Sequence, residues 1–338
     1  VITGSGTAAN ESMLSSAVGD KNILIITNGE FGQRLVDIST IHNKNTFTLN
    51  FPWGDELDLV MIEDYLKSND IDVVAMVHHE TSSGMLNPIE KVGALVNKYN
   101  AAFIVDGVSS AGAEKIDMEK CHIDFFSSSS SKAIGSYAGL SFVLGKATSF
   151  EKLEFLPVKT MYLNLYKFYH FIKNVSQTPN TPAVHLFYAL EQTLKNMLFT
   201  GVEAQHALLQ SRAKYLRRGL LNLGLKFLIK EKNMCSVLTT VRLPKHIDVG
   251  TLRERLREKS IIIYEGKGCF ANKVFQVGNI GELSEADMQF FLTSLNDVLL
   301  SFPLSTDEFS PEQDFLQQEG NLPRKELYSF FPLKAETI

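Results

Sequence analysis

The sequence predicts an α/β protein in which a large, mostly parallel sheet is followed by a smaller α+β domain. Three observations support this prediction. Short apolar segments rich in β-branched residues alternate with helix-like segments through the first half of the chain. The connections between them are short, which favours parallel strands with helices on both faces. The alternation ends near residue 156, and a mixture of other segments follows.

Each predicted element of the first half has a local signal. Segments 22–27, 72–77 and 102–105 are short, apolar and β-branched, as expected of strands buried on both faces. Segments 57–68 and 88–99 are helix-like, with Asn87 as the cap and Pro88 at the first helical position of the second one. Ligands of such sheets bind beyond the carboxyl ends of the strands, so the residues after each apolar segment are candidates for chemistry.

The second half begins without clear alternation, over residues 156–175. The two prolines in residues 178–182 (Thr-Pro-Asn-Thr-Pro) predict a rigid turn. Helices are expected at 183–198 and 202–223, and a smaller α+β domain at 236–243, 249–259, 260–264 and 284–301. We therefore expect a large domain over 1–200, a small domain over 201–303 and a tail over 304–338.

Composition excludes several classes of function. The 338 residues carry a net charge of -5, which gives no general attraction to nucleic acid or anionic membranes. No apolar run is long enough to span a bilayer. The three cysteines lie far apart, with no metal-ligand spacing, so a reducing compartment, the cytoplasm, is expected.

The first candidate site is the glycine-rich run Thr3-Gly4-Ser5-Gly6-Thr7, which precedes a helix-like segment at 8–18. Small residues allow close approach of a ligand, and the start of a helix offers free N–H groups. This combination suits a phosphate. A plain turn before a helix is the alternative.

Asp106 directly follows the apolar segment 102–105 and is the second candidate. An unpaired buried carboxylate is costly, so it requires a cationic partner. A metal ion, a substrate amine or a protonated ring nitrogen would each serve. The alternative is a carboxylate that caps the following helix.

The third candidate is Lys132, which follows the apolar residues Phe125 and Phe126 and then five serines. Lysine is the side chain that forms Schiff bases with carbonyl cofactors. A solvated surface lysine is the alternative. Metal binding by His78 and His79 is disfavoured because adjacent strand residues point to opposite faces. A nucleophilic Cys269 is also disfavoured, since the sequence places no base near it.

Taken in order, these segments resemble the class-V aminotransferases of fold type I, which use pyridoxal 5′-phosphate (PLP). The resemblance is strongest to the 2-aminoethylphosphonate–pyruvate transaminase group, and alanine–glyoxylate aminotransferases are wider relatives. The matching motifs are Gly4-Ser5-Gly6-Thr7, Asn28-Gly29-Glu30-Phe31-Gly32-Gln33-Arg34, His79-Glu80-Thr81-Ser82-Ser83-Gly84, Val105-Asp106-Gly107-Val108, Ser128-Ser129-Ser130-Ser131-Lys132 and Val277-Gly278-Asn279-Ile280-Gly281.

The resemblance implies a role for each matching position. Lys132 would hold PLP as a Schiff base and shuttle the proton, and Asp106 would pair with the ring nitrogen. The other implied cofactor contacts are Ser5, Gly6, Thr7 and Ser131 with the phosphate, Phe31 and Val108 with the two ring faces, and Thr81 with the phenolic oxygen. Thr181 matches a position that reaches the phosphate of the neighbouring subunit, which implies a homodimer with shared active sites.

The chain departs from the family pattern in two places. Relatives carry a segment before the glycine-rich loop, with an Asn-Pro-Gly-Pro run, that this sequence lacks. We therefore expect either a truncated N-terminus or a segment supplied in another way. Relatives also read Phe-Arg-Ile-Gly-Asn-Ile-Gly where this chain has Gln276 after Phe275. Glutamine cannot form the charged bidentate pair that arginine makes with a substrate carboxylate. Arg34, Lys267 or Lys273 would have to supply the positive charge.

The resemblance implies a PLP-dependent aminotransferase that acts on a small amine and a small 2-oxo acid such as pyruvate. 2-Aminoethylphosphonate is a candidate amine. The predicted substrate residues are Gln276 and Arg34. Two alternatives stay open, because the usual arginine is absent. One is a PLP-dependent lyase on an amino substrate, and the other is a binding subunit of the same fold without activity.

Overall fold

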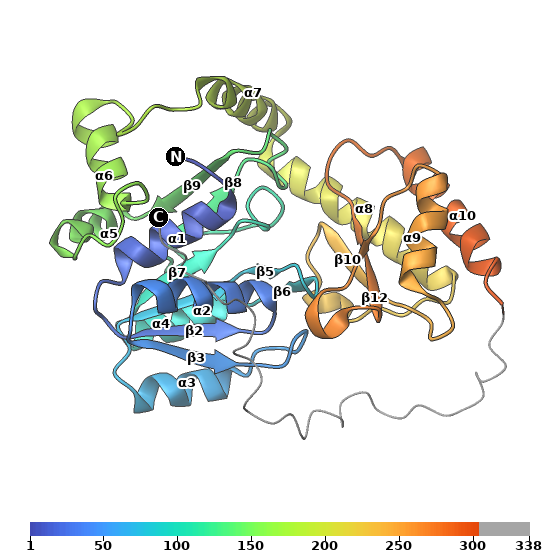
Figure 1. Cartoon of the computed structure of the whole chain (residues 1–338), viewed down its shortest axis with the longest axis horizontal. Helices are drawn as coiled ribbons and strands as arrows, with labels where there is room; N and C mark the ends of the chain where they lie inside the picture. Colours follow the sequence, from blue (N-terminus) through green and yellow to red (C-terminus); the bar gives the residue numbers. More distant parts are fainter. Residues whose placement is uncertain (304–338) are drawn as a thin grey trace, which may run out of the picture. The chain divides into compact units, whose positions relative to one another are not determined.

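The computed structural model describes residues 1–303, which contain a seven-stranded sheet in the order β1-β9-β8-β7-β4-β2-β3 (Figure 1). Its strands are β1 (Ile2–Thr3), β2 (Ile23–Thr27), β3 (Thr46–Asn50), β4 (Val73–Val77), β7 (Ala102–Asp106), β8 (Phe125–Ser129) and β9 (Leu140–Gly145). From β8 to β3, neighbouring strands pair in parallel, whereas β9 runs antiparallel to both β8 and β1. The predicted large, mostly parallel sheet is confirmed.

The predicted apolar segments form the centre of this sheet. Every residue of β2 and β4 is buried, and the two strands pair in register from Ile23 opposite Val73. Helices on both faces exclude water from these strands, and β-branched side chains suit such positions. The predicted strand at 102–105 is also confirmed, and it extends by one residue so that Asp106 ends β7.

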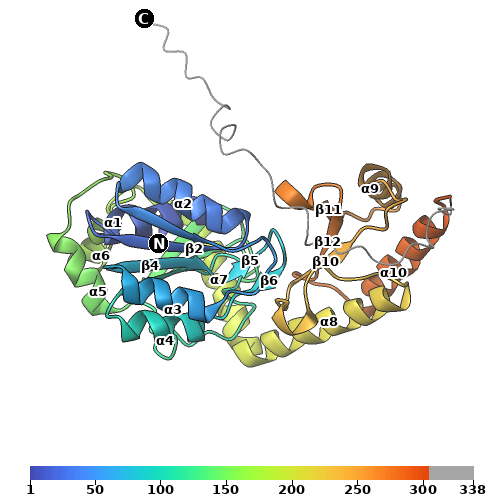
Figure 2. The ribbon, with the colours of Figure 1, turned by 90° about the horizontal axis from the view of Figure 1, so that it is seen from below.

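Helices cover both faces of the sheet, and alternate strand residues point to opposite sides. On one face α1 (Gly6–Ala17) and α2 (Glu30–His42) pack Met13, Leu35 and Ile38 against Ile23 and Ile25. On the other face, α3 (Leu59–Ser68) and α4 (Ile89–Lys98) form a second core with the alternate strand residues, whose side chains point to that face. Figure 2 shows the two helical layers on either side of the strands.

Two helix starts differ from the prediction. Pro88, and not Asn87, occupies the capping position of α4, which begins at Ile89. The Asn87 side chain is instead engaged in the sheet, because its Nδ2 donates to Val77 O at 2.9 Å and to Asn28 Oδ1 at 3.0 Å. The helix expected at 8–18 starts earlier, at Gly6. The absence of a side chain at Gly6 allows its backbone to lie against Val108.

A helical region connects the large sheet to the second one. It consists of α5 (Ala147–Lys152), α6 (Leu165–His170), a π-helical turn at Phe171–Val175, α7 (Val184–Thr200) and α8 (Val202–Asn222). The two long helices match the predicted ones to within two residues. Residues 178–182 are irregular, as two prolines require. Gly201 lies between α7 and α8, and a domain boundary between residues 200 and 201 stays a prediction.

The second sheet is antiparallel, with the strand order β10-β12-β11. Its elements are β10 (Leu238–Arg242), β11 (Tyr264–Glu265) and β12 (Val274–Gly278), with α9 (Val249–Glu258) and α10 (Glu285–Leu300) packed on it. Ser284 and Asp287 form a capping box at the start of α10. The predicted tail, 304–338, lies outside the described residues. Within residues 1–303, no helix has the length and apolar character needed to cross a bilayer.

A short hairpin between β4 and α4 completes the large-sheet region. It pairs β5 (His79–Glu80) with β6 (Met85–Leu86) in antiparallel fashion. Its turn contains Thr81 and the motif serines, and Gly84 has a φ of 81° that favours glycine. This hairpin places Thr81 beyond the carboxyl end of the sheet.

The packing of α4 on the loop before β8 gives a stability prediction. A methyl group on Gly93 would overlap the carbonyl oxygen of Cys121, which belongs to the backbone. We expect Gly93→Ala to lower the free energy of unfolding by about 1–3 kcal/mol, measured by urea denaturation. The control is Gly250→Ala in α9, where the nearest atom is a side-chain oxygen of Asp248 at 3.1 Å. Alanine should there be neutral or stabilising. Equal stabilities of the two variants would contradict this packing.

Candidate active site

A buried carboxylate marks the carboxyl end of the central strand β7. Asp106 accepts a hydrogen bond from Asn10 Nδ2 at 2.7 Å and another from the backbone N of Val108 at 2.9 Å. Ser127 Oγ donates to Asn10 Oδ1 at 2.6 Å and lies 3.5 Å from Asp106 Oδ1. Neutral groups from α1, β8 and the loop after β7 therefore fix both oxygens of the carboxylate.

This carboxylate has no cationic side chain beside it. Within residues 1–303, no Lys, Arg or His nitrogen lies within 4.0 Å of the Asp106 oxygens. Burial raises the pKa of Asp106 above its ordinary value, and the hydrogen bonds from Val108, Asn10 and Ser127 offset part of that rise. An ionised carboxylate in such a place is stabilised by a positive group that arrives from outside the chain. The arrangement is thus suited to bind a cationic ligand atom.

Lys132 lies at the same edge of the sheet as Asp106. β7 and β8 are adjacent parallel strands in which Asp106 lies opposite Ser127, and Lys132 follows β8 in an exposed turn. Ser130 closes this turn, since its backbone N bonds Leu140 O at 3.0 Å and its hydroxyl lies 2.5 Å from Tyr137 O. The two predicted catalytic residues therefore follow the carboxyl ends of neighbouring parallel strands.

The glycine-rich loop comes close to the loop after β7. Ser5 is the capping residue of α1, and Gly6 and Thr7 form the first helical turn, where backbone N–H groups have no partner within the helix. A Cβ on Gly6 would lie 2.6 Å from Val108 Cγ1, so only glycine allows this approach. The helix start, with its positive dipole end, thus adjoins the Asp106 region.

A buried glutamate fixes the start of α2, a role that the sequence did not reveal. Glu80 accepts hydrogen bonds from the backbone N of Gly32 at 2.9 Å and of Phe31 at 3.3 Å. Ser82 Oγ also donates to it at 2.5 Å. Burial raises the pKa of Glu80, and these hydrogen bonds oppose that rise. The carboxylate thereby holds Phe31 and the β5–β6 turn together.

Two buried histidines lie between β4 and this turn. His79 Nδ1 lies 3.1 Å from Ser109 O, an acceptor, so this nitrogen carries the proton. Burial lowers the pKa of His79, and the charge of Lys132 adds to that effect. Burial also lowers the pKa of His78 to about 3. Both imidazoles are therefore neutral near pH 7. No group of three or more potential ligand side chains in residues 1–303 could hold a metal ion.

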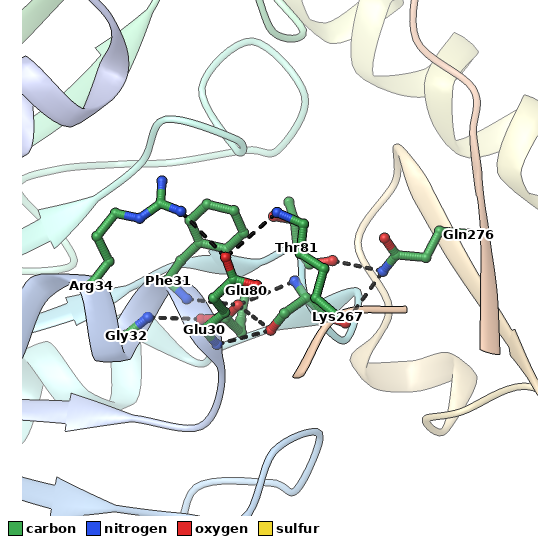
Figure 3. A network of polar contacts seen from close by, with 9 residues as sticks. Glu30, Phe31, Gly32, Arg34, Glu80, Thr81, Lys267 and Gln276 are labelled. Atoms are coloured by element: carbon green, nitrogen blue, oxygen red, sulfur yellow. Dashed lines mark hydrogen bonds and ion pairs between the residues drawn. The ribbon is translucent and has the colours of Figure 1, made fainter. Parts of the chain in front are cut away.

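The predicted substrate residues come from a strand of the second sheet and from a helix that packs on the large sheet. Gln276 is buried in β12, and its Nε2 donates to Thr81 O at 2.8 Å (Figure 3). Arg34 lies on α2 with its guanidinium carbon 4.6 Å from the centroid of the Phe31 ring. Lys267, from the loop after β11, has its ammonium 5.4 Å from the same centroid. From the sequence, Lys267 is predicted only as one of three residues that could supply the positive charge of the missing arginine.

The remaining predicted residues are more exposed. Ser131 is exposed in the turn beside Lys132, and Thr181 is exposed in the loop before α7. No described hydrogen bond joins Thr181 to the other predicted residues within this chain. Asn10 and Ser127 were missed by sequence reasoning. The only signal for Asn10 was a polar side chain on the buried face of α1, four residues after Gly6.

Comparisons with known proteins agree on one family. Residues 1–284 match the family described as aminotransferase class-V. An uncharacterized aminotransferase of Methanocaldococcus jannaschii is 33% identical over 293 residues, 85% of this chain and 76% of that protein. A 2-aminoethylphosphonate–pyruvate transaminase of Lysinibacillus sphaericus is 32% identical over 86% of this chain and 80% of its own length. The crystal structure of an alanine–glyoxylate aminotransferase from Nostoc sp. has a TM-score of 0.84 at 29% identity, covering 88% of this chain and 80% of that one.

The neutral histidines predict a loss of stability in acid. Between the ordinary histidine pKa of 6.5 and the value of about 3 for His78, the unfolded chain binds a proton that the folded chain does not. Stability therefore falls as pH decreases through this range, by about 2 kcal/mol for His78 between pH 7 and pH 5. We expect His78→Asn to reduce this loss by about that amount in urea titrations at the two pH values. His122→Asn is the control, at a partly exposed position whose left-handed backbone asparagine tolerates. An unchanged loss in His78→Asn would refute the assignment.

Proposed function

This chain belongs to the class-V aminotransferase family, and we propose that it uses PLP to transfer an amino group from a small amine, such as 2-aminoethylphosphonate, to a small 2-oxo acid such as pyruvate. The fold class and enzyme class predicted from the sequence motifs are confirmed by the family match. The substrate pair rests on relatives named for it, which are 31–32% identical over most of this chain. The observation that carries the proposal is the buried Asp106 carboxylate beside the Lys132 turn.

The side chains at this edge fit PLP. The cofactor has an anionic phosphate and a ring nitrogen that can carry a proton, and the site offers a helix start for the first and a lone carboxylate for the second. Ser128 and Ser129 add buried hydroxyls without a hydrogen-bond partner in the described structure. Buried polar atoms of this kind are usually paired. Because adjacent strand residues point to opposite faces, one of the two hydroxyls is available to a ligand on the Asp106 side.

Asp106 would hold the ring nitrogen in its protonated form. When bound, PLP supplies an electron sink for the pair of electrons left on the substrate carbon. A carboxylate next to the nitrogen favours the positive charge there, and Asn10 and Val108 keep that carboxylate aimed. Phe31 and Val108 would lie against the two faces of the ring, and the N–H groups of Gly6 and Thr7 would bind the phosphate.

Lys132 would bind the cofactor aldehyde through its amine and later act as the base. The same Nζ, when not bound to the cofactor, would take the proton from the substrate α carbon. Lys132 follows the carboxyl end of β8, and the hydrogen bonds of Ser130 fix the turn that carries it, which suits this role. Thr81 would donate to the phenolic oxygen and so orient the ring.

We also propose a homodimer. Over residues 155–208 the chain exposes many large apolar side chains, more than a monomer ordinarily shows in one stretch. They are Phe155, Val158, Met161, Tyr162, Ile172, Val175, Val184, Tyr188, Leu194, Leu198, Phe199, Val202 and Leu208. The helix α7 buries only Leu190 of its 17 residues within the described chain. Thr181 lies in this stretch, consistent with its implied contact to the phosphate of a neighbouring subunit.

The role of Lys132 has a direct test. We expect borohydride reduction of the PLP-loaded protein to fix the cofactor on Lys132, located by peptide mapping. Lys132→Ala should lower the transamination rate about 100-fold or more. Lys146→Ala, whose exposed amine pairs with Asp124, is the matched control. A fixed adduct in the Lys132→Ala protein would reject the assignment. Substrate amine alone should convert bound PLP to its amine form, and its failure to do so with turnover intact would favour a lyase.

The dimer has a separate test. We expect sedimentation velocity to show a dimer, and Phe199→Asp to weaken its dissociation constant at least about 10-fold, because a charge would then be buried in an apolar contact. Leu300→Asp is the control, since this exposed leucine lies on α10, outside the apolar stretch. A wild-type monomer at micromolar concentration, or equal effects of the two substitutions, would rule out this interface.

A further inference from the structure

Gln276 has no donor left for a substrate acid. Its Nε2 donates to Thr81 O at 2.8 Å and to Thr240 Oγ1 at 3.1 Å, and lies 3.4 Å from Ser82 O. An amide nitrogen carries two hydrogens, and these acceptors engage both of them. The side chain is also buried and neutral. The residue thus links β12 to the β5–β6 turn, and an incoming anion would have to find its positive charge elsewhere.

Two cations gather beside Phe31 and share one carboxylate oxygen (Figure 3). Arg34 Nη2 lies 3.3 Å from Glu30 Oε1, and Lys267 Nζ lies 3.5 Å from the same atom. The Arg34 guanidinium carbon lies 4.6 Å and the Lys267 ammonium 5.4 Å from the centroid of the Phe31 ring. On opposite faces of the ring, the two cations would be too far apart for both to reach Glu30 Oε1, so they do not face each other across it.

The loop that carries Lys267 is held in place by aromatic packing. Gly268 has a φ of 52°, and a Cβ there would lie 2.6 Å from Trp53 Cζ3. Only glycine fits both the left-handed backbone and this contact. Phe270, at the end of the same short turn, has its ring centroid 6.1 Å from that of Trp53. The backbone of Lys267 is thus fixed against the loop after β3, and its long side chain reaches from there to Phe31.

We propose that Lys267, with Arg34 beside it, binds the acid group of the substrates. The ligand would be the carboxylate of the 2-oxo acid and the carboxylate or phosphonate of the amine donor. Glu30 neutralises one of the two positive charges, so the cluster retains a net charge that attracts an anion. This inference rests on the proposed function, since it assigns the specificity of that same site. It gives Gln276 a positioning role in place of the substrate role expected from the sequence.

The test compares Lys267→Met with Lys230→Met in the PLP-loaded protein. Lys230 is a matched control, because it is an exposed lysine that also pairs with a glutamate, Glu56. We expect Lys267→Met to raise the KM for pyruvate about 10- to 100-fold with little change in kcat, as for a lost charge-assisted contact. Half-reaction rates with ethylamine, which has no acid group, should be unchanged. Lys267→Arg should restore most of the affinity for pyruvate.

A binding measurement provides a readout without turnover. Oxamate has the shape and charge of pyruvate but cannot react with an amine in the same way. Its dissociation constant can be followed by calorimetry and by the fluorescence of Trp53, the single tryptophan of the chain, which touches the Lys267 loop. We expect Lys267→Met to weaken oxamate binding about 10- to 100-fold and Lys230→Met to leave it unchanged.

The two proposals fail in different ways. A wild-type protein that takes up no PLP or transaminates no amine overturns the proposed function, and this inference with it. A wild-type transaminase whose KM and oxamate affinity are the same in Lys267→Met overturns the anion site alone. Equal losses with pyruvate and with ethylamine would also overturn it, because they would show that Lys267 has a general structural role.

Discussion

The architecture of the site depends on one buried carboxylate. Asp106 sits at the end of a central strand, away from water, and its hydrogen-bond partners are all neutral. A charge in such a place is destabilising unless something positive faces it. Asn10 comes from α1 and Ser127 from β8, so orienting this single group requires the helix and both strands to be in register. The folded chain thus orients a buried carboxyl group that a positively charged ligand atom would stabilise in its ionised form.

Much of the fold could be predicted because parallel strands follow simple rules. Segments such as 73–77 must be apolar on both faces, and their carboxyl ends lie at a common edge. That rule alone brings Asp106 and the Lys132 turn together, although they are separate in the sequence. The motif order then identified the family, since the glycine loop, the acid and the lysine occur in the sequence in which the family uses them.

The rest of the site could not be predicted, because it depends on contacts between distant segments. Asn87 looked like a helix cap, yet its amide pairs with Asn28 across the sheet edge. Glu80 was part of a family motif without an assigned role, yet its carboxylate accepts hydrogen bonds from the start of α2. Gln276 could be recognised as a departure from the family, but not as a link to Thr81. Local sequence patterns determine the helices and strands, whereas contacts with distant segments determine the role of each polar side chain.

Glu30 adds a built-in competitor to the cluster around Phe31. Its Oε1 already accepts the two cations that would otherwise seek an anion, so any acid that binds there must displace an intramolecular carboxylate. The Glu30 carboxylate keeps the two positive groups together when no acid is bound, and it lowers the free energy gained when an acid binds. A transaminase must release one acid before it can accept the next. Competition from the tethered Glu30 carboxylate would therefore lower the affinity of the proposed site for both acids and favour their release.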